Sequence, residues 1–297
     1  MSSALILAAG FGTRLQPLTL ELPKPVVPVG DRPLLAHIAA ACRRAGIARL
    51  VANVHHEHAK ISTINKELDL DIQVVVEPSI RGTAGGVAGA RAHFEPGAPV
   101  LVWNGDILTE ASPGAALDIA RERDAQVLLV SEREGRAGTV GLDDDGSVVR
   151  LRGRVFGRET RSADYIGIMA LGPGVVSELP EQGCLFGDVG LAHLAAGRKL
   201  YTVPHAAPWS DLGDLEAYVA ANREWLAGRG SWSAPGVALP SGVTLEGSIL
   251  GARVRVSGTG PLRRVIAWPG APVVAPLTDA VVLSSGRVVS AAGAAEN

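Results

Sequence analysis

Apolar and polar positions follow two patterns in the first half of the chain: short apolar runs, and longer segments with helical periodicity. The apolar runs predict strands and the periodic segments predict amphipathic helices. We expect strands at residues 3–8, 49–54, 72–76, 100–103 and 126–131, and helices at residues 33–45, 57–68, 83–93 and 113–123. This alternation is typical of a Rossmann-like α/β fold, in which a mainly parallel sheet carries helices on both faces.

The pattern changes to short alternating strands between residues 138 and 171. The turn sequence Asp143-Asp144-Asp145-Gly146 lies between two of these strands and is a signal for a hairpin. We therefore expect a β region inserted into the α/β domain.

The composition shifts to Gly, Pro, Val and Ser after Gly228, which predicts a domain of residues 1–228 and a small β domain of residues 229–297. Val237, Val243 and Ile249 recur every six residues, as in the turns of a short left-handed parallel β-helix. The repeat fails by Arg255, so we expect about two coils, with a small irregular β cap as the alternative.

Composition places the chain among globular proteins rather than membrane or nucleic-acid-binding proteins. Its 297 residues are 47% hydrophobic, without a run of 18 apolar residues or a leading signal segment, so we expect a cytoplasmic protein with no membrane partner. The net charge of −2 gives no reason to expect a nucleic-acid partner. Cys42 and Cys184 are too few for a disulfide framework and are expected to be reduced thiols.

A glycine turn directly follows the first predicted strand. Gly10 and Gly12 allow the backbone to turn tightly and direct N–H groups at an anion, while Arg14 and Lys24 add a forked and a compact cation. The turn lacks the lysine pattern of a P-loop and the third glycine of a dinucleotide fingerprint, which argues against an oxidoreductase. The segment therefore predicts a different kind of phosphate site.

The motif Gly-Phe-Gly-Thr-Arg-Leu at residues 10–15, with Pro-Lys-Pro at 23–25, resembles the signature of the sugar-1-phosphate nucleotidyltransferases. Later motifs follow in the order of that family. They are Val-Val-Val-Glu at 74–77, Gly-Thr-Ala-Gly-Gly at 82–86, Asn-Gly-Asp at 104–106 and Trp-Ser-Asp-Leu-Gly at 209–213. The resemblance covers about residues 3 to 226 and implies transfer of a nucleotide from a nucleoside triphosphate to a sugar 1-phosphate, with release of pyrophosphate.

The resemblance also implies a role for each matching residue. Arg14, Lys24 and Asp106 would be catalytic, and Asp106 with Asp211 would bind Mg²⁺, a hard cation that prefers oxygen ligands. The nucleotide would be bound by Leu7, Ala8, Ala9, Gly10, Gly12, Thr13, Glu77, Gly82, Thr83 and Gly85. The sugar would be bound by Asn104, Tyr165 and Gly167.

Several of these residues also have ordinary structural interpretations. Taken alone, Asp106 could be only a turn-forming residue, and Asp211 could be only a helix cap. The neighbouring histidines at 55, 56 and 58 lack the cysteines or second ligand pair of a transition-metal site, so we expect surface residues. Trp103 is expected in the core.

The chain departs from the family after the hairpin. Many members have Glu-Lys-Pro there, whose lysine binds the sugar phosphate, whereas this chain reads Val-Arg-Leu-Arg-Gly-Arg at 149–154. An arginine could take that role, or the alternation could mark an exposed strand face. The identity of the sugar depends on this point.

The nucleotide prediction rests on Glu77, because a carboxylate offers two acceptors to the adjacent N1–H and N2–H donors of guanine. The first choice is GTP with mannose 1-phosphate or a related sugar. Uridylyl or thymidylyl transfer is the alternative, in which the first loop reads the base and Glu77 only caps the turn at Pro78. A catalytically silent regulatory subunit is less favoured, since Arg14, Lys24 and both aspartates are retained; the sequence leaves a homo-oligomer open.

Overall fold

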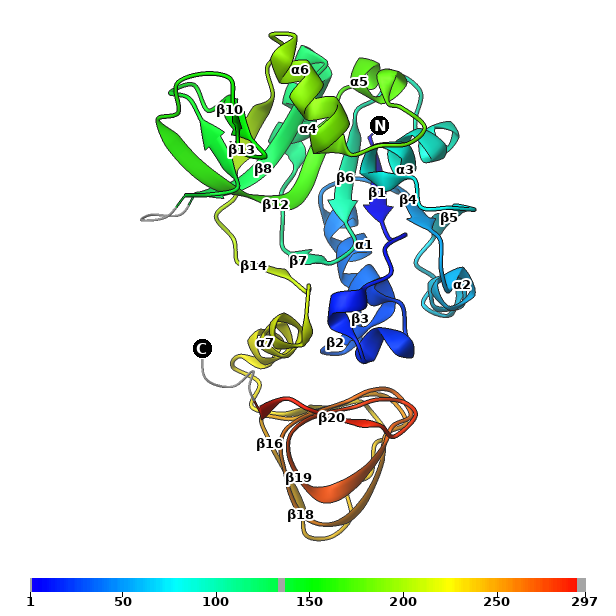
Figure 1. The fold of residues 1–297 in the computed structure, drawn as a ribbon. Helices are drawn as coiled ribbons and strands as arrows, with labels where there is room; N and C mark the ends of the chain where they lie inside the picture. Colours follow the sequence, from blue (N-terminus) through cyan, green and yellow to red (C-terminus); the bar gives the residue numbers. More distant parts are fainter. Residues whose placement is uncertain (1, 133–136, 293–297) are drawn as a thin grey trace. The chain divides into compact units, whose positions relative to one another are not determined.

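The computed structural model describes residues 2–132 and 137–292, which cluster into two compact units (Figure 1). Unit 1 contains the chain up to Gly10 together with Ile38–Trp209, and unit 2 contains Phe11–His37 together with the chain from Ser210 onward. The segment with the predicted phosphate-binding cations thus clusters with the C-terminal part. That residues 1–228 form the catalytic domain and residues 229–297 a separate β domain stays a prediction.

Unit 1 is built on a ten-stranded sheet. At its centre β1 (Ser3–Leu7) runs parallel to β4 (Arg49–Val54) and to β6 (Val100–Asn104), and β5 (Ile72–Val76) forms the edge beside β4. On the other side, β12 (Arg161–Leu171) pairs with β6 in antiparallel orientation. The predicted α/β sheet is therefore confirmed, and its mixed half begins at β12.

The remaining strands of unit 1 join through β12. They are β8 (Gln126–Glu132), β9 (Val140–Leu142), β10 (Val148–Leu151), β11 (Arg154–Val155) and β13 (Tyr201–Pro204). Strands β9 and β10 form the antiparallel hairpin predicted around residues 143–146. A short strand β7 (Ile107–Thr109) follows β6.

The four helices predicted in the first half are all present. They are α1 (Leu34–Arg44), α2 (His58–Glu67), α3 (Gly82–Ala90) and α4 (Gly114–Arg123). Later come α5 (Pro173–Glu178), a π-helical segment (Leu185–Gly190) and α6 (Leu191–Ala195). Within these described residues, no helix is long and apolar enough to cross a membrane.

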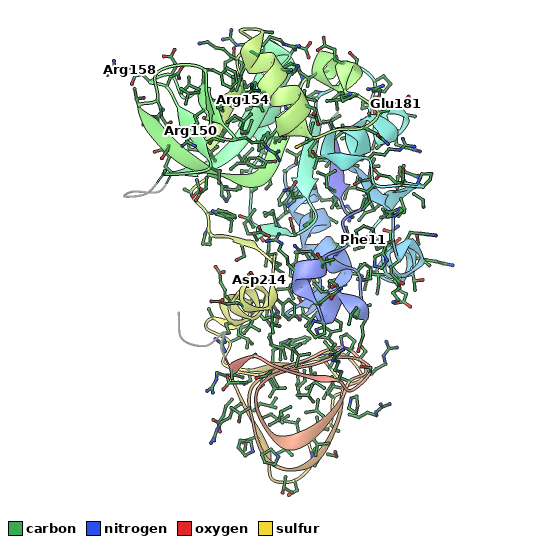
Figure 2. The ribbon with its side chains drawn as sticks, in the orientation of Figure 1. Phe11, Arg150, Arg154, Arg158, Glu181 and Asp214 are labelled. Carbon is green, nitrogen blue, oxygen red and sulfur yellow. The ribbon has the colours of Figure 1, made fainter. Side chains whose placement is uncertain are left out.

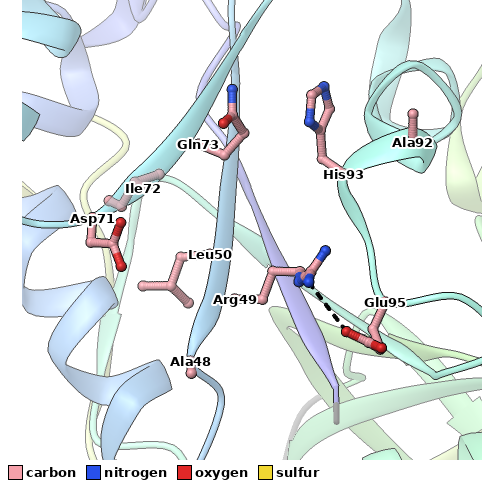
Figure 3. A pocket seen from close by; sticks show the side chains of 9 residues that line it. All are labelled: Ala48, Arg49, Leu50, Asp71, Ile72, Gln73, Ala92, His93 and Glu95. Carbon is pink, nitrogen blue, oxygen red and sulfur yellow. Dashed lines mark ion pairs between the residues drawn. The ribbon is translucent and has the colours of Figure 1, made fainter.

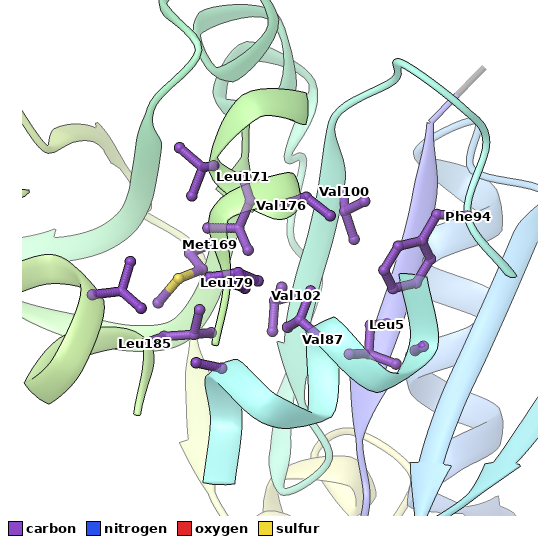
Figure 4. Packing of buried hydrophobic residues seen from close by; sticks show 14 of the residues in the cluster. Leu5, Val87, Phe94, Val100, Val102, Met169, Leu171, Val176, Leu179 and Leu185 are labelled. Atoms are coloured by element: carbon purple, nitrogen blue, oxygen red, sulfur yellow. The ribbon is translucent and has the colours of Figure 1, made fainter. Parts of the chain in front are cut away.

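Both faces of the central strands are covered, since Ala4, Leu5 and Ile6 of β1 are fully buried although alternate residues point to opposite faces. On one face, Leu5 packs in a cluster with Val87 of α3, Val102 of β6 and Met169 of β12 (Figure 4). This core fixes the strand positions, and hence the edge at which they end.

Unit 2 begins with three 3₁₀ turns and a small hairpin that the sequence pattern did not predict. The turns are η1 (Thr13–Leu15), η2 (Leu18–Leu20) and η3 (Lys24–Val26), and the hairpin is β2 (Pro28–Val29) with β3 (Arg32–Pro33). Helix α7 (Leu215–Leu226) follows β14 (Trp209–Asp211).

The C-terminal strands wind as a triangular coil (Figure 1). They are β15 (Trp232–Ser233), β16 (Val243–Glu246), β17 (Ile249–Leu250), β18 (Arg255–Ala267) and β19 (Pro272–Val282), all paired in parallel, with β20 (Val288–Ser290) antiparallel to β19. The predicted end of the repeat at Arg255 is wrong, because parallel pairing continues to Val282. The interior there is filled partly by residues such as Val265 and Ala275, which fall outside the earlier six-residue spacing.

Candidate functional site

Three parallel strands of unit 1 end side by side. Leu7 of β1 pairs with Asn53 of β4 on one side and with Asn104 of β6 on the other. Ligands in open α/β sheets bind beyond these carboxyl ends. The predicted nucleotide segment Leu7 to Gly10 begins here, with Ala8 and Ala9 buried and Gly10 exposed.

The Asn-Gly-Asp turn lies directly against β1. The N–H of Gly105 donates to the carbonyl of Leu7 at 2.9 Å, and a Cβ on Gly105 would come within 2.5 Å of that carbonyl oxygen. The buried indole of Trp103 donates to the carbonyl of Ile107 at 3.0 Å and closes the turn. Asp106 is therefore held half-exposed at the edge of the sheet, and Trp103 is a core residue as expected.

The predicted sugar-binding residues gather around this turn. Burial raises the pKa of Tyr165, and the nearby charges of Asp106 and Cys184 raise it further, so the phenol stays protonated. Gly167 has a positive φ of 82°, and a Cβ there would lie 2.5 Å from Ile107 Cγ1 and 3.1 Å from Asn104 Nδ2. Gly167 thus permits β12 to approach the Asn-Gly-Asp turn at residues 104–106. This approach brings Asn104, Asp106 and Tyr165 into one cluster.

Glu77 follows β5 and is 4% exposed. Its Oε1 accepts from Nδ2 of Asn53 at 2.8 Å, and its Oε2 accepts a long 3.4 Å bond from the N–H of Arg81. Sequence reasoning missed Asn53, although an amide within the buried run of residues 50–54 was a readable signal. Each oxygen of Glu77 retains a further lone pair.

Gly82 and Gly85, from the predicted nucleotide-binding segment at the start of α3, pack against residues of unit 1 that are distant in sequence. A Cβ on Gly82 would lie 2.4 Å from the carbonyl oxygen of Gly183, and one on Gly85 would lie 2.4 Å from that of Glu181. Thr83 Oγ1 accepts from the N–H of Leu185 at 2.8 Å. These three residues therefore seat residues 181–185 on α3, and their contact with a nucleotide stays a prediction.

In unit 2, Gly12 adopts a left-handed conformation with φ 64°. A Cβ there would lie 2.9 Å from Cγ2 of Thr19 and 3.3 Å from Cβ of Lys24, and the hydroxyl of Thr19 donates to the carbonyl of Gly12 at 2.9 Å. Glycine is required at this turn for two reasons, its φ and the close approach of Lys24. Thr13 and Arg14 follow in the exposed part of η1.

Arg14 lies against the Trp-Ser-Asp-Leu-Gly motif, far away in sequence. A Cβ on Gly213 would come within 3.0 Å of Nη1 of Arg14. Asp211 is exposed, and the N-cap of α7 is Asp214, whose carboxylate accepts from the N–H of Ala217 at 2.9 Å. The alternative interpretation of Asp211 as a helix cap is therefore wrong.

The arginines of residues 149–154, of which Figure 2 labels Arg150 and Arg154, have different contacts. Arg150 is paired with Glu159 at 2.7 and 3.0 Å and also donates to the carbonyl of Gly138. Arg152 Nη1 lies 3.3 Å from the position of a Cβ on Gly187. Arg154 is exposed in β11.

Cys184 lies beside Arg152 and beside Thr83 of the segment 82–86. Partial burial opposes its ionisation, but N–H groups of Gly187 and Phe186, the hydroxyl of Thr83 and the charge of Arg152 hold the pKa of the thiol below its usual value. Tyr165 meets Phe186 edge to face, with 4.8 Å between ring centres. The π-helical segment therefore forms a wall beside the predicted sugar residues.

Asp106 in unit 1 and Asp211 in unit 2 are each of the oxygen-donor type that Mg²⁺ prefers. Within the described residues, no group of three or more His, Cys, Asp or Glu side chains could hold a metal, the three neighbouring histidines included. Half-exposed Asp106 and exposed Asp211 are hard oxygen donors. Mg²⁺ is typically held by one or two carboxylates together with substrate phosphates rather than by a protein cage.

A cavity of about 530 Å³ lies elsewhere in unit 1 (Figure 3). It is lined by the first residues of β4 and β5, and Arg49 at its wall pairs with Glu95 at 3.3 Å. Since β4 and β5 are parallel, this cavity lies at the opposite sheet edge from Asn53 and Glu77.

Residues 3–228 match the family model described as "Nucleotidyl transferase". The chain belongs to the nucleotidyl transferase family. The match covers both the strand-end cluster of unit 1 and the Arg14–Gly213 neighbourhood of unit 2.

Curated relatives of this nucleotidyl transferase have names that describe enzymes acting on sugar phosphates. A mannose-1-phosphate guanylyltransferase of Mycobacterium tuberculosis is 31% identical over 236 residues, which are 76% of this chain and 65% of that protein. A UTP–glucose-1-phosphate uridylyltransferase of Synechocystis is 26% identical over 241 residues, 74% of this chain and 62% of that protein. The chain thus spans less than two thirds of the length of either relative.

A solved structure supports the fold. HddC from Yersinia pseudotuberculosis superposes with a TM-score of 0.64 at 21% identity, over 76% of this chain and all of that one. At this identity, the likeness shows a shared α/β fold.

Proposed function

We propose that this protein transfers a nucleoside monophosphate from a nucleoside triphosphate to a sugar 1-phosphate, and so makes a nucleoside-diphosphate sugar and pyrophosphate in the cytoplasm. The observation that carries the proposal is the sheet edge at which Leu7, Asn53 and Asn104 end in register. It gathers the start of the predicted phosphate loop, a buried carboxylate and a metal-type carboxylate within one unit of a nucleotidyl transferase.

The reaction brings two anions together, so the residues must reduce repulsion and align the attacking oxygen with phosphorus and leaving group. Arg14, whose guanidinium is held beside Gly213, would grip the triphosphate and the charge that develops on pyrophosphate. Lys24, largely buried beside Gly12, would act as a point charge at the α-phosphate.

Asp106 and Asp211 would hold the ion, which when bound would neutralise phosphate charge in the transition state. Asn104 and the protonated phenol of Tyr165 would bind sugar hydroxyls beside Asp106. We propose Arg152, rather than Arg150, as the arginine for the sugar phosphate, because Glu159 already engages Arg150 with two bonds.

GTP and mannose 1-phosphate are the proposed substrates. Glu77 supports GTP because its two oxygens can meet the two adjacent donors of guanine, and the M. tuberculosis relative carries a guanylyltransferase name. Uridylyl or thymidylyl transfer is the second candidate, favoured by the low exposure of Glu77 and by the Synechocystis relative. A silent regulatory role is less favoured, since all four charged residues of the proposed site are retained.

The test is pyrophosphate release over a matrix of GTP, UTP, dTTP, ATP and CTP against several sugar 1-phosphates. We expect turnover to be highest with GTP and mannose 1-phosphate and to need a divalent cation. Tight nucleotide-sugar binding without turnover in any well would instead indicate the regulatory role.

A further inference from the structure

Asn53 joins two parts of the nucleotide site that the sequence treats separately. It is 3% exposed near the end of β4. Its backbone carbonyl and its side-chain Oδ1 both accept from the N–H of Ala8, at 3.1 and 3.2 Å, and its Nδ2 donates to Glu77 at 2.8 Å. One amide side chain therefore links the start of the phosphate loop to the proposed base reader.

Glu77 has little freedom to turn away from this amide. Its N–H donates to the carbonyl of Val54 at 2.7 Å, and its own carbonyl oxygen lies 2.8 Å from Nδ1 of His55. Helix α3 closes the remaining side, because a Cβ on Gly86 would lie 2.6 Å from Nδ2 of Asn53 and 3.2 Å from Oε1 of Glu77. The carboxylate plane is thus set by Asn53 and by packing together.

We infer that Asn53 is a positioning residue that sets the base preference of the site by fixing the carboxylate of Glu77. The inference rests on the proposed function. Asn53 occupies one lone pair of Oε1, and the Arg81 N–H occupies one of Oε2, so the remaining lone pairs point in fixed directions. A site built for two donors rejects a base that offers one, because an acceptor is then left without a partner.

The test compares kcat/KM for GTP and UTP, with mannose 1-phosphate as the common acceptor. Asn53→Leu removes the amide at similar size, and we expect the GTP-to-UTP ratio to fall at least about tenfold, the scale of one lost hydrogen bond. Asn53→Asp places a second carboxylate against Glu77 and should lower the ratio further. Combining Asn53→Asp with Glu77→Gln restores one donor and one acceptor, and we expect parental melting temperature with a preference moved toward UTP.

Asn222→Leu is the matched control. Asn222 is 1% exposed and makes two buried hydrogen bonds within unit 2, so its loss should lower the melting temperature and leave the base ratio unchanged. An unchanged GTP-to-UTP ratio in folded Asn53→Leu would overturn the inference. Should that variant not fold, a ratio in the double variant equal to that of Glu77→Gln alone would overturn it. No pyrophosphate from any triphosphate with the parent would sink the proposed function instead, and GTP and UTP dissociation constants by calorimetry would still test Asn53.

Discussion

Trp268 of the C-terminal coil donates its indole N–H to the hydroxyl of Tyr218 at 2.9 Å, and both residues are fully buried. The same hydroxyl donates onward to the carbonyl of Pro28 at 2.7 Å. A continuous chain of hydrogen bonds thus ties the coil to α7 and to the hairpin that follows Lys24, all within unit 2.

Tyr218→Phe should destabilise the protein by about 1–3 kcal/mol, because it leaves a buried indole N–H and a carbonyl without their partner. Denaturant unfolding measures this free energy. Tyr201→Phe, at a half-exposed position in β13, is the control and should change it by less than about 0.5 kcal/mol. Equal stability of both variants would show that this chain of bonds does not hold unit 2 together.

Asp106→Asn and Asp211→Asn should each lower turnover by at least about 10²-fold while the fold persists, the scale of losing one transition-state stabiliser. Chelation of divalent cations should abolish turnover, and added Mg²⁺ should restore it. Asp214→Asn is the matched control three residues from Asp211, because asparagine also caps helices well. Near-parental turnover in either test variant would remove that residue from the site.

Arg14→Lys should lower kcat/KM for the triphosphate at least about tenfold, since a point charge does not replace two parallel donors. Gly213→Ala should have a similar effect without changing any charge, because the added Cβ would press on the guanidinium at 3.0 Å. Arg121→Lys, at a surface pair with Asp118, serves as the control. The bidentate argument fails if Arg14→Lys releases pyrophosphate at the parental rate.

A direct competition of GTP, UTP and dTTP should favour GTP in the parent and shift toward the pyrimidines in Glu77→Gln. The shift follows because an amide replaces one of two acceptors with a donor. Product nucleotide sugars separated by chromatography give the ratio. Preference of the parent for UTP or dTTP, or an unchanged preference in the variant, would show that Glu77 is not the guanine reader.

Alkylation should distinguish the two thiols. Burial raises the pKa of Cys42 to about 12, whereas the pKa of Cys184 lies below its usual value. Thiolate at Cys184 is then present below the ordinary cysteine pKa of about 8.5, and its reaction slows only as pH falls through the lowered pKa. Peptide mapping after iodoacetamide at about pH 7 should find Cys184 labelled and Cys42 intact, with slower labelling in Arg152→Ala. Faster labelling of Cys42 would contradict this.

Local pattern was sufficient for the α/β half of the fold, because a buried strand and an amphipathic helix differ in period whatever surrounds them. Strand order was not readable, since pairing of β1 with β4 and β6 depends on contacts between residues far apart in sequence. The 3₁₀ turns of residues 13–26 were missed because short turns carry no periodic signal.

The sequence by itself determined the family and predicted the phosphate loop and the two carboxylate motifs, because these depend on residue types at short, fixed spacings. The position of each residue in space was decided by the tertiary structure. Packing places Gly213 beside Arg14, and a hydrogen bond joins Asn53 to Glu77. A further hydrogen bond makes Asp214, and not the nearby Asp211, the cap of α7. Such contacts satisfy buried polar groups across long sequence separations, and no local pattern encodes which groups will meet.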